Sequence, residues 1–196
     1  RPLAPNLEFE LAKARIMARY EGNAKDNVIN FQQSLDKKRY AIEAAAQYGL
    51  ALSQYENKNY QSAISQLETL LRNDKKNLFY VDALADAYIA VKAFDKAITM
   101  LSELNLLMPN NQVVTLNYAN VLNEAEQYSK AETLLQDFLV LSPKNFIAND
   151  LLSEVYRNIF PGKMIAFDDN QYIGDPKTCE MLANGHNIGI TLAESP

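Results

Sequence analysis

The stretch FDKAI at residues 94–98 decides the fold, because it recurs at a fixed interval. Thirty-four residues earlier the chain reads YQSAI, at residues 60–64, and thirty-four residues later it reads YSKAE, at residues 128–132. Each copy places an aromatic residue three positions before an alanine. An interval of this length indicates a repeated helical unit, because such units bury their apolar faces by stacking on one another.

Three windows, residues 44–77, 78–111 and 112–144, share more than this aromatic–alanine box. Their common positions are the eighth residue (Ala51, Ala85, Ala119), the twentieth (Ala63, Ala97, Ala131) and the twenty-fourth (Leu67, Leu101, Leu135). Small side chains at the eighth and twentieth positions let two helices approach closely. Pro109 and Pro143 end the second helix of two windows. Each window is therefore predicted to fold as a pair of helices.

These positions resemble the tetratricopeptide repeat (TPR), a helix–turn–helix unit of 34 residues. The resemblance implies an all-α fold, a right-handed TPR superhelix or α-solenoid of about four repeats, whose first helices line a concave groove. The turn position that is usually glycine in the family is Lys58, Lys92 and Glu126 here. The turn is therefore less sharply signalled than glycine would make it.

The repeat array is predicted to cover residues 1–159. Residues 6–40 are interpreted as a degenerate first repeat, with helices expected at Leu7–Tyr20 and Asn23–Lys37, and residues 145–159 as a last helix without a partner. The chain begins with Arg1 rather than methionine, so we expect it to be a processed chain or a piece of a longer protein.

The segment 160–196 is expected to be an irregular tail of unassigned role, because four of the six glycines fall in it. Its stretches MIAFDD and NIGITLA are compatible with short strands. Cys179 and His186 are too few for a zinc site and are interpreted as an incidental pair. Asp168, Asp169 and Asp175 are interpreted as a solvated acidic turn, because the spacing of an EF-hand loop is missing.

Charge and hydropathy limit the classes of partner that this chain is expected to bind. The net charge is −5 and no basic cluster is present, which argues against nucleic acid as a partner. No apolar run approaches the roughly 18 residues of a membrane span. The HExxH motif and glycine-rich phosphate loops are also missing from the sequence. We therefore expect no catalytic residue, metal ligand or cofactor in this chain.

Three stretches resemble a narrower family. YGLAL at residues 48–52, LNYAN at 116–120 and FELAKARIMARYEG at 9–22 are similar to the C-terminal TPR region of bacterial periplasmic zinc metallopeptidases of the beta-barrel assembly-enhancing protease type. The resemblance covers Leu7 to Arg157; beyond it the family continues with further helical repeats, and this chain does not.

The narrower resemblance implies a periplasmic location and zinc only in a protease domain outside this chain. It also implies contacts with outer-membrane protein assembly machinery and with that protease domain.

The TPR resemblance also maps residues onto the groove. By repeat position they are Tyr48, Leu52, Tyr55, Asp82, Asp86, Ile89, Asn120, Asn123, Asp150, Glu154 and Arg157. We predict that this surface holds a protein or peptide, since asparagine both donates to and accepts from an extended backbone. Its acidic or neutral character argues against the co-chaperone TPRs that clamp a terminal carboxylate, with Arg157 as the exception.

The sequence thus predicts a non-catalytic protein-interaction module, and three alternatives stay open. In the first, the mapped residues are only the solvated faces of stacked helices. In the second, the chain is a structural scaffold that forms homo-oligomers through its unpaired last helix. In the third, the tail, with Cys179 and His186, completes an enzyme in trans.

Overall fold

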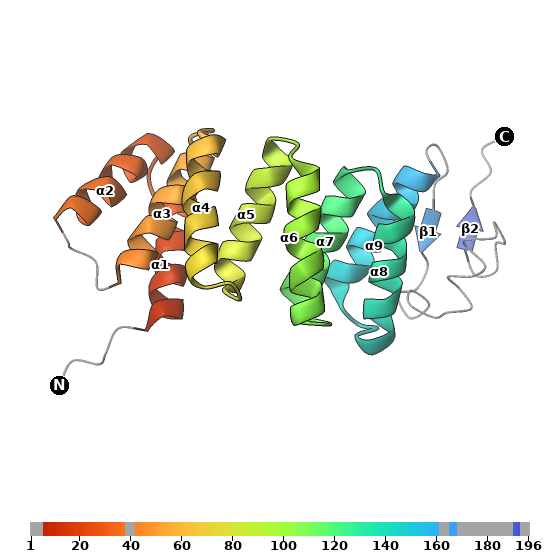
Figure 1. Ribbon diagram of the computed structural model, residues 1–196. Helices are drawn as coiled ribbons and strands as arrows, with labels where there is room; N and C mark the ends of the chain where they lie inside the picture. The colour runs from red at the N-terminus through yellow and green to blue at the C-terminus, as the bar shows by residue number, and fades with distance from the viewer. Residues whose placement is uncertain (1–5, 38–41, 161–164, 168–189, 193–196) are drawn as a thin grey trace. The chain divides into compact units, whose positions relative to one another are not determined.

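The computed structural model describes residues 6–37, 42–160, 165–167 and 190–192. In this part of the chain the helices are α1 (Leu7–Tyr20), α2 (Ala24–Asp36), α3 (Glu43–Glu56), α4 (Tyr60–Asn73), α5 (Leu78–Ala90), α6 (Phe94–Leu107), α7 (Gln112–Glu124), α8 (Tyr128–Leu141) and α9 (Phe146–Ile159) (Figure 1). The strands β1 (Ile165–Phe167) and β2 (Ile190–Leu192) pair antiparallel, with Phe167 opposite Ile190. The predicted all-α TPR class is confirmed, and both strands lie in the stretches predicted for them.

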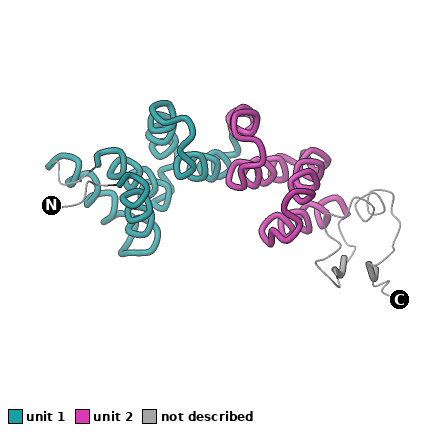
Figure 2. Tube along the Cα trace, turned by 90° about the horizontal axis from the view of Figure 1, so that it is seen from below, with its two compact units in different colours: residues 1–93 teal, residues 94–196 magenta. Residues whose placement is uncertain are grey.

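The chain divides into two compact units, residues 1–93 and 94–196 (Figure 2). The described helices of unit 1 are α1 to α5, and those of unit 2 are α6 to α9. In each unit a first helix packs on the helix that follows it, α3 on α4 and α7 on α8. Each unit is described by itself below.

Asparagine caps fix where three of the helices begin. Asn77, Asn111 and Asn145 precede α5, α7 and α9, and each side-chain oxygen accepts a hydrogen bond from a backbone N–H of the first turn, at 3.2, 3.2 and 3.0 Å. Such a bond satisfies one of the N–H groups that have no partner inside the helix. The caps recur with the 34-residue interval of the repeat.

The turns inside the helix pairs adopt the backbone conformation that favours glycine. Lys58, Lys92 and Glu126 have φ angles of 62°, 56° and 60°. At Lys92 the turn is closed by the N–H of Ala93, which donates to the carbonyl oxygen of Tyr88 at 2.9 Å. The turn geometry of the family is therefore kept although its glycine is replaced.

Lys92→Gly is expected to raise the free energy of unfolding by about 0.5–1 kcal/mol. It removes about 1–2 kcal/mol of left-handed strain, and the greater freedom of glycine in the unfolded chain offsets part of this gain. Urea unfolding followed by circular dichroism measures the change. The control Lys96→Gly, inside α6, is expected to destabilise. A Lys92→Gly protein less stable than wild type would show that the turn is not strained.

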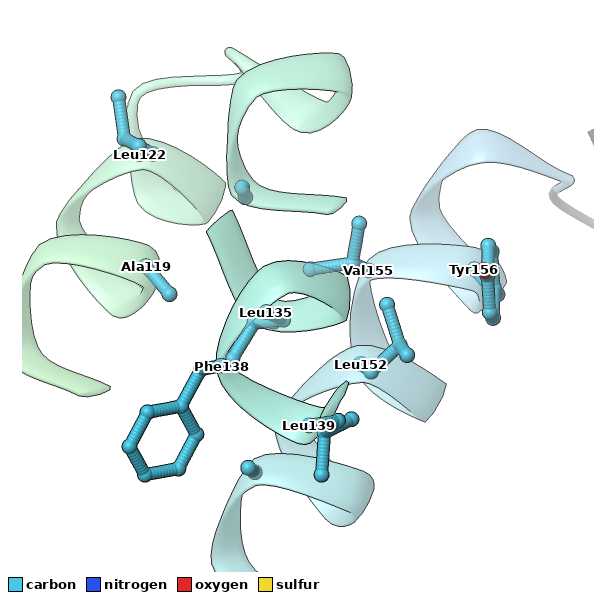
Figure 3. Close-up of a cluster of buried hydrophobic side chains, with 10 residues drawn as sticks. Ala119, Leu122, Leu135, Phe138, Leu139, Leu152, Val155 and Tyr156 are labelled. Carbon is cyan, nitrogen blue, oxygen red and sulfur yellow. The ribbon is translucent and has the colours of Figure 1, made fainter. Parts of the chain in front are cut away.

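The core of unit 2 is a cluster of buried side chains from α7, α8 and α9 (Figure 3). Its members are Ala119, Leu122, Ala131, Leu135, Phe138, Leu139, Ala148, Leu152, Val155 and Tyr156. Ala119 and Ala131 occupy the two small positions of the repeat, which brings α7 and α8 close together. The cluster makes α7–α9 one packed body.

Unit 1 is built around α3. Six consecutive residues, Tyr48 to Ser53, are buried, and six residues exceed one and a half helical turns, so every side of α3 is covered there. Both α1 and α2 pack on α3, and they make few contacts with each other. The side chain of Asn27 in α2 donates to the carbonyl oxygens of Met17 at 3.0 Å and Glu21 at 2.6 Å, which ties the end of α1 to α2.

None of the described helices is long and apolar enough to cross a membrane.

Candidate functional site

The residues predicted to line the groove fall on two surfaces, one in each unit. We call the first the α3–α5 face; it comprises Tyr48, Leu52, Tyr55, Asp82, Asp86 and Ile89. We call the second the α7–α9 face; it comprises Asn120, Asn123, Asp150, Glu154 and Arg157. The two faces differ in how much of their surface is accessible.

Two residues of the α3–α5 face are core residues in this structure. Tyr48 is 0% exposed and Leu52 is 1% exposed. The ring of Tyr48 lies edge-on to Phe79, with centroids 6.1 Å apart, and 5.7 Å from the ring of Tyr80. Burial raises the pKa of the Tyr48 hydroxyl well above its usual value. Neither side chain offers surface to a partner in this structure.

Tyr55 and Ile89 are partly exposed at the end of the same face. The ring of Tyr55 packs edge-on against Tyr60, with centroids 5.3 Å apart. The guanidinium carbon of Arg19 lies 6.0 Å from the centre of the Tyr55 ring, at the outer limit for a cation–π contact. Burial raises the pKa of Tyr55, so its hydroxyl is neutral and able to donate a hydrogen bond.

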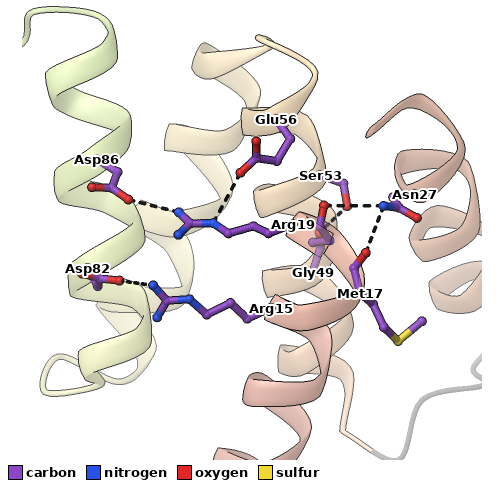
Figure 4. A network of polar contacts seen from close by, with 10 residues as sticks. Arg15, Met17, Arg19, Asn27, Gly49, Ser53, Glu56, Asp82 and Asp86 are labelled. Atoms are coloured by element: carbon purple, nitrogen blue, oxygen red, sulfur yellow. Dashed lines mark hydrogen bonds and ion pairs between the residues drawn. The ribbon is translucent and has the colours of Figure 1, made fainter. Parts of the chain in front are cut away.

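The carboxylates of this face are paired with arginines from α1 (Figure 4). Arg15 donates to Asp82 at 2.7 Å and Arg19 donates to Asp86 at 3.0 Å. Arg19 also lies 3.4 Å from Glu56 at the end of α3. The side chains of the two arginines and two aspartates are partly buried, so their pairs are only partly screened by water, whereas Glu56 is exposed. The chain's own first helix therefore neutralises the acidic part of the α3–α5 face.

The protonation of these partners follows from burial and charge. Burial raises the pKa of Asp86, and the neighbouring charge of Asp82 raises it further, while Arg19 and Arg15 act in the opposite direction. Burial lowers the pKa of Arg19, but the hydrogen bond and charge of Asp86 outweigh it, so the guanidinium stays charged. Burial of the ionised Asp86 thus costs more free energy than its ion pairs with the arginines recover. The pairs therefore contribute to specificity rather than to stability.

The stability of Asp86→Asn relative to wild type is expected to depend on pH. Because the folded-state pKa of Asp86 is raised, its contribution to stability is fully present below the unfolded pKa and is lost as pH rises through the folded pKa. The asparagine variant has no such loss. Urea unfolding of both proteins between pH 4 and 7 is therefore expected to favour the variant increasingly toward pH 7. The opposite trend would mean that the arginines hold the folded-state pKa of Asp86 below its unfolded value.

On the α7–α9 face, Asn123 is occupied by contacts inside the unit. It is 3% exposed, it donates to Glu154 at 3.1 Å, and it accepts from the side chain of Asn158 at 2.9 Å. These bonds join α7 to α9. We therefore assign Asn123 to holding the face together, and Glu154 is positioned by it.

The remaining residues of the α7–α9 face are accessible. Asn120 is half-buried, and Asp150 and Arg157 are exposed. In the part of the chain that the structure describes, neither Asp150 nor Arg157 forms an ion pair. This face therefore carries charge that no other described side chain neutralises, in contrast to the α3–α5 face.

A cavity of about 360 Å³ opens between the two last described helices. Its lining residues are Tyr128, Ser129 and Glu132 of α8 and Tyr156, Asn158, Ile159 and Phe160 at α9 and its end. The hydroxyl of Tyr156 accepts a hydrogen bond from Gln136 at 3.1 Å, which fixes the ring at its wall. The sequence predicts that this last helix lacks a partner helix.

Sequence reasoning did not identify Arg15, Arg19 and Glu56 as part of the site. A signal was present, because Arg15 and Arg19 are four residues apart and match the spacing of Asp82 and Asp86. The described residues contain no group of three or more His, Cys, Asp or Glu side chains that could hold a metal ion. The tail residues Asp168, Asp169, Asp175, Cys179 and His186 lie outside the described residues.

Comparisons with known proteins support both resemblances. No family model matches the chain. It is 38% identical over 153 residues to the "Putative beta-barrel assembly-enhancing protease" of Vibrio cholerae, a match that covers 78% of this chain and 32% of that protein. It is 28% identical over 147 residues to the beta-barrel assembly-enhancing protease of Escherichia coli K12, covering 75% and 30%. The chain thus spans about a third of the length of the curated relatives it matches.

Solved structures share the fold. A thermophilic TPR protein of Thermus thermophilus superimposes with a TM-score of 0.60 and 18% identity, over 90% of this chain and 97% of that one. MamA of AMB-1 superimposes with a TM-score of 0.54 and 16% identity, over 92% and 93%. At this level of identity the likeness establishes the TPR fold and nothing further.

Proposed function

We propose that this chain, a TPR protein whose sequence resembles the beta-barrel assembly-enhancing proteases, is a docking module that binds a protein segment on its α7–α9 face. The observation that carries the proposal is the exposed charge of Asp150 and Arg157 on a face that α7 and α9 hold rigid. Charges of this kind set the register and specificity of a protein contact more than its affinity.

The face also indicates which segment fits. Asp150 and Arg157 are seven residues apart on α9, about 10 Å along a helix axis at 1.5 Å per residue. A peptide in the polyproline II conformation covers that distance in about three residues, at about 3.1 Å per residue, and its side chains return to the same side every third residue. We expect a segment with a basic residue opposite Asp150 and Glu154 and an acidic residue about three positions away, opposite Arg157. The amide of Asn120 is available to the backbone between them.

The names of the relatives suggest where such a partner is found. Two relatives are named for enhancing beta-barrel assembly. We propose that the docked proteins are components or substrates of outer-membrane β-barrel assembly and that the chain works in the periplasm. In this proposal, a protease domain outside this chain binds zinc and carries out catalysis, and this module serves that domain.

Capture from a bacterial envelope extract tests this function. The chain is used as bait, with the variant Asp150→Lys/Arg157→Glu, which reverses both charges at constant net charge. The control Asp137→Lys/Lys144→Glu makes the same exchange at exposed positions of unit 2 outside the α7–α9 face. We expect wild type and control to capture identified outer-membrane assembly proteins and the variant to lose at least 90% of the signal.

Equal capture by all three proteins would exclude the α7–α9 face as the binding surface. No capture by a folded wild-type chain would exclude binding by this chain alone.

Homo-oligomerisation through the last helix is a second candidate, and the cavity between α8 and α9 is the observation that favours it. A second copy would fill the cavity with an apolar side chain. The mass in solution decides this point. A monomer at 100 μM would exclude oligomerisation at that concentration, whereas a dimer lost in Ile159→Lys would support it.

A further inference from the structure

The way α1 packs on α3 resembles a bound ligand more than a repeat helix. The buried side chains of α1 are Leu11, Ala14 and Ala18, which lie on one side of the helix because they are spaced by three and four residues. Two of the three are alanine, which lets the backbone of α1 approach its neighbour closely. The side of α3 that carries Tyr48 and Leu52 is buried, although the repeat pattern assigns it to the groove.

The charged side chains of α1 have the same spacing as their partners on α5. Arg15 and Arg19 lie one turn apart on α1, and Asp82 and Asp86 lie one turn apart on α5. Arg15 pairs with Asp82 and Arg19 with Asp86, so residue numbers rise together and the two helices run in the same direction (Figure 4). A shift of α1 by one turn would leave only one pair. The face therefore specifies both the direction and the register of the helix it holds.

Helix α1 buries few large side chains, although it packs closely on α3. Leu11 is its one large side chain that is fully buried, whereas Phe9, Ile16 and Tyr20 are 67%, 51% and 78% exposed. Ion pairs that reach water contribute little to stability and are screened by salt. Helix α1 is thus held in one register on α3, while most of its large side chains stay exposed.

We propose that the α3–α5 face is a binding site for a protein helix that carries two basic side chains four residues apart beside small residues, that α1 fills this site in cis, and that such a helix from another protein takes its place. When α1 leaves, Tyr48, Leu52, Asp82 and Asp86 become available together. This site shares no residue with the α7–α9 face. An experiment can therefore exclude this proposal without excluding the proposed function, and the reverse.

A labelled synthetic peptide that copies residues 6–21 tests the site in trans. In the variant Arg15→Glu/Arg19→Glu, the new carboxylates of α1 repel those of the α3–α5 face. Helix α1 is therefore expected to leave the face, which opens the site. Fluorescence anisotropy is expected to show at least tenfold tighter peptide binding to this variant than to wild type, and a loss of that binding at high salt. Equal binding to both proteins would overturn the proposal.

Two further variants separate site-specific binding from a general charge effect. Lys13→Glu/Lys25→Glu changes the net charge by the same amount at exposed positions of α1 and α2, and it is expected to bind the peptide like wild type. Adding Asp82→Lys/Asp86→Lys to the open variant is expected to abolish peptide binding. Unchanged peptide binding after this addition would place the binding elsewhere and overturn the proposal.

Hydrogen exchange on the wild-type chain keeps the test independent of how the variants fold. Amides in the middle of α1 are expected to exchange at least tenfold faster than those of α3, because α1 opens without the rest of unit 1. Excess unlabelled peptide is expected to speed the exchange of α1 further, because it takes the place of α1. Equal rates in α1 and α3, or rates of α1 that do not respond to the peptide, would overturn the proposal.

Discussion

Leu135→Ala is expected to lower the free energy of unfolding by about 3 kcal/mol. Leu135 is 0% exposed and lies in the core that joins α7, α8 and α9. Alanine removes three carbon atoms and leaves a cavity between three helices that are fixed by their other contacts. Urea unfolding monitored by circular dichroism measures the loss.

The control for this prediction is Leu106→Ala, because Leu106 is 82% exposed on α6. It is expected to change stability by no more than about 0.5 kcal/mol. Stacked repeats are stabilised by their nearest neighbours, so the loss in Leu135→Ala is expected to reduce hydrogen-exchange protection in α7–α9 and to spare α1–α4. A loss below about 1 kcal/mol would show that the core is not packed as described.

Gly49→Ala is expected to destabilise the protein by about 2 kcal/mol. A side chain in place of the glycine hydrogen would lie less than 3.0 Å from three ring atoms of Phe31, and that residue is itself only 2% exposed. Glycine to alanine inside a helix normally stabilises by about 0.5–1 kcal/mol. The sign of the measured change in unfolding free energy therefore decides whether α2 packs on α3 at this distance.

Combining Gly49→Ala with Phe31→Leu is expected to recover part of the loss. The smaller side chain makes room for the added methyl group, so the two substitutions are expected to couple by about 1 kcal/mol or more in a double-mutant cycle. Additive effects would mean that the two residues do not touch.

The helices could be predicted from the sequence because the repeat supplies many independent signals. Small residues, prolines and the aromatic–alanine box all agree, and the helix Leu7–Tyr20 begins and ends as expected. The turns could be predicted with less certainty. Lys58, Lys92 and Glu126 give no glycine signal, yet the backbone keeps the left-handed conformation because the helix pairs on either side impose it.

The candidate site was harder to predict, because a repeat pattern treats each window alike. Tyr48 and Leu52 hold groove positions by pattern, but both side chains are buried in the core of unit 1. Asn123 likewise holds a groove position and uses its amide inside the unit. These outcomes depend on contacts between segments far apart in sequence, which periodicity does not report.

Site-specific photo-crosslinking tests the central claim, that the α7–α9 face docks a protein. A photoreactive amino acid is placed at Asn120 on the face or at Asp137, an exposed residue of α8, in the chain as expressed in bacterial cells. We predict a discrete crosslinked product from position 120, weakened by Arg157→Glu, and no such product from position 137. A product of equal strength from both positions, or none from position 120, would contradict the account.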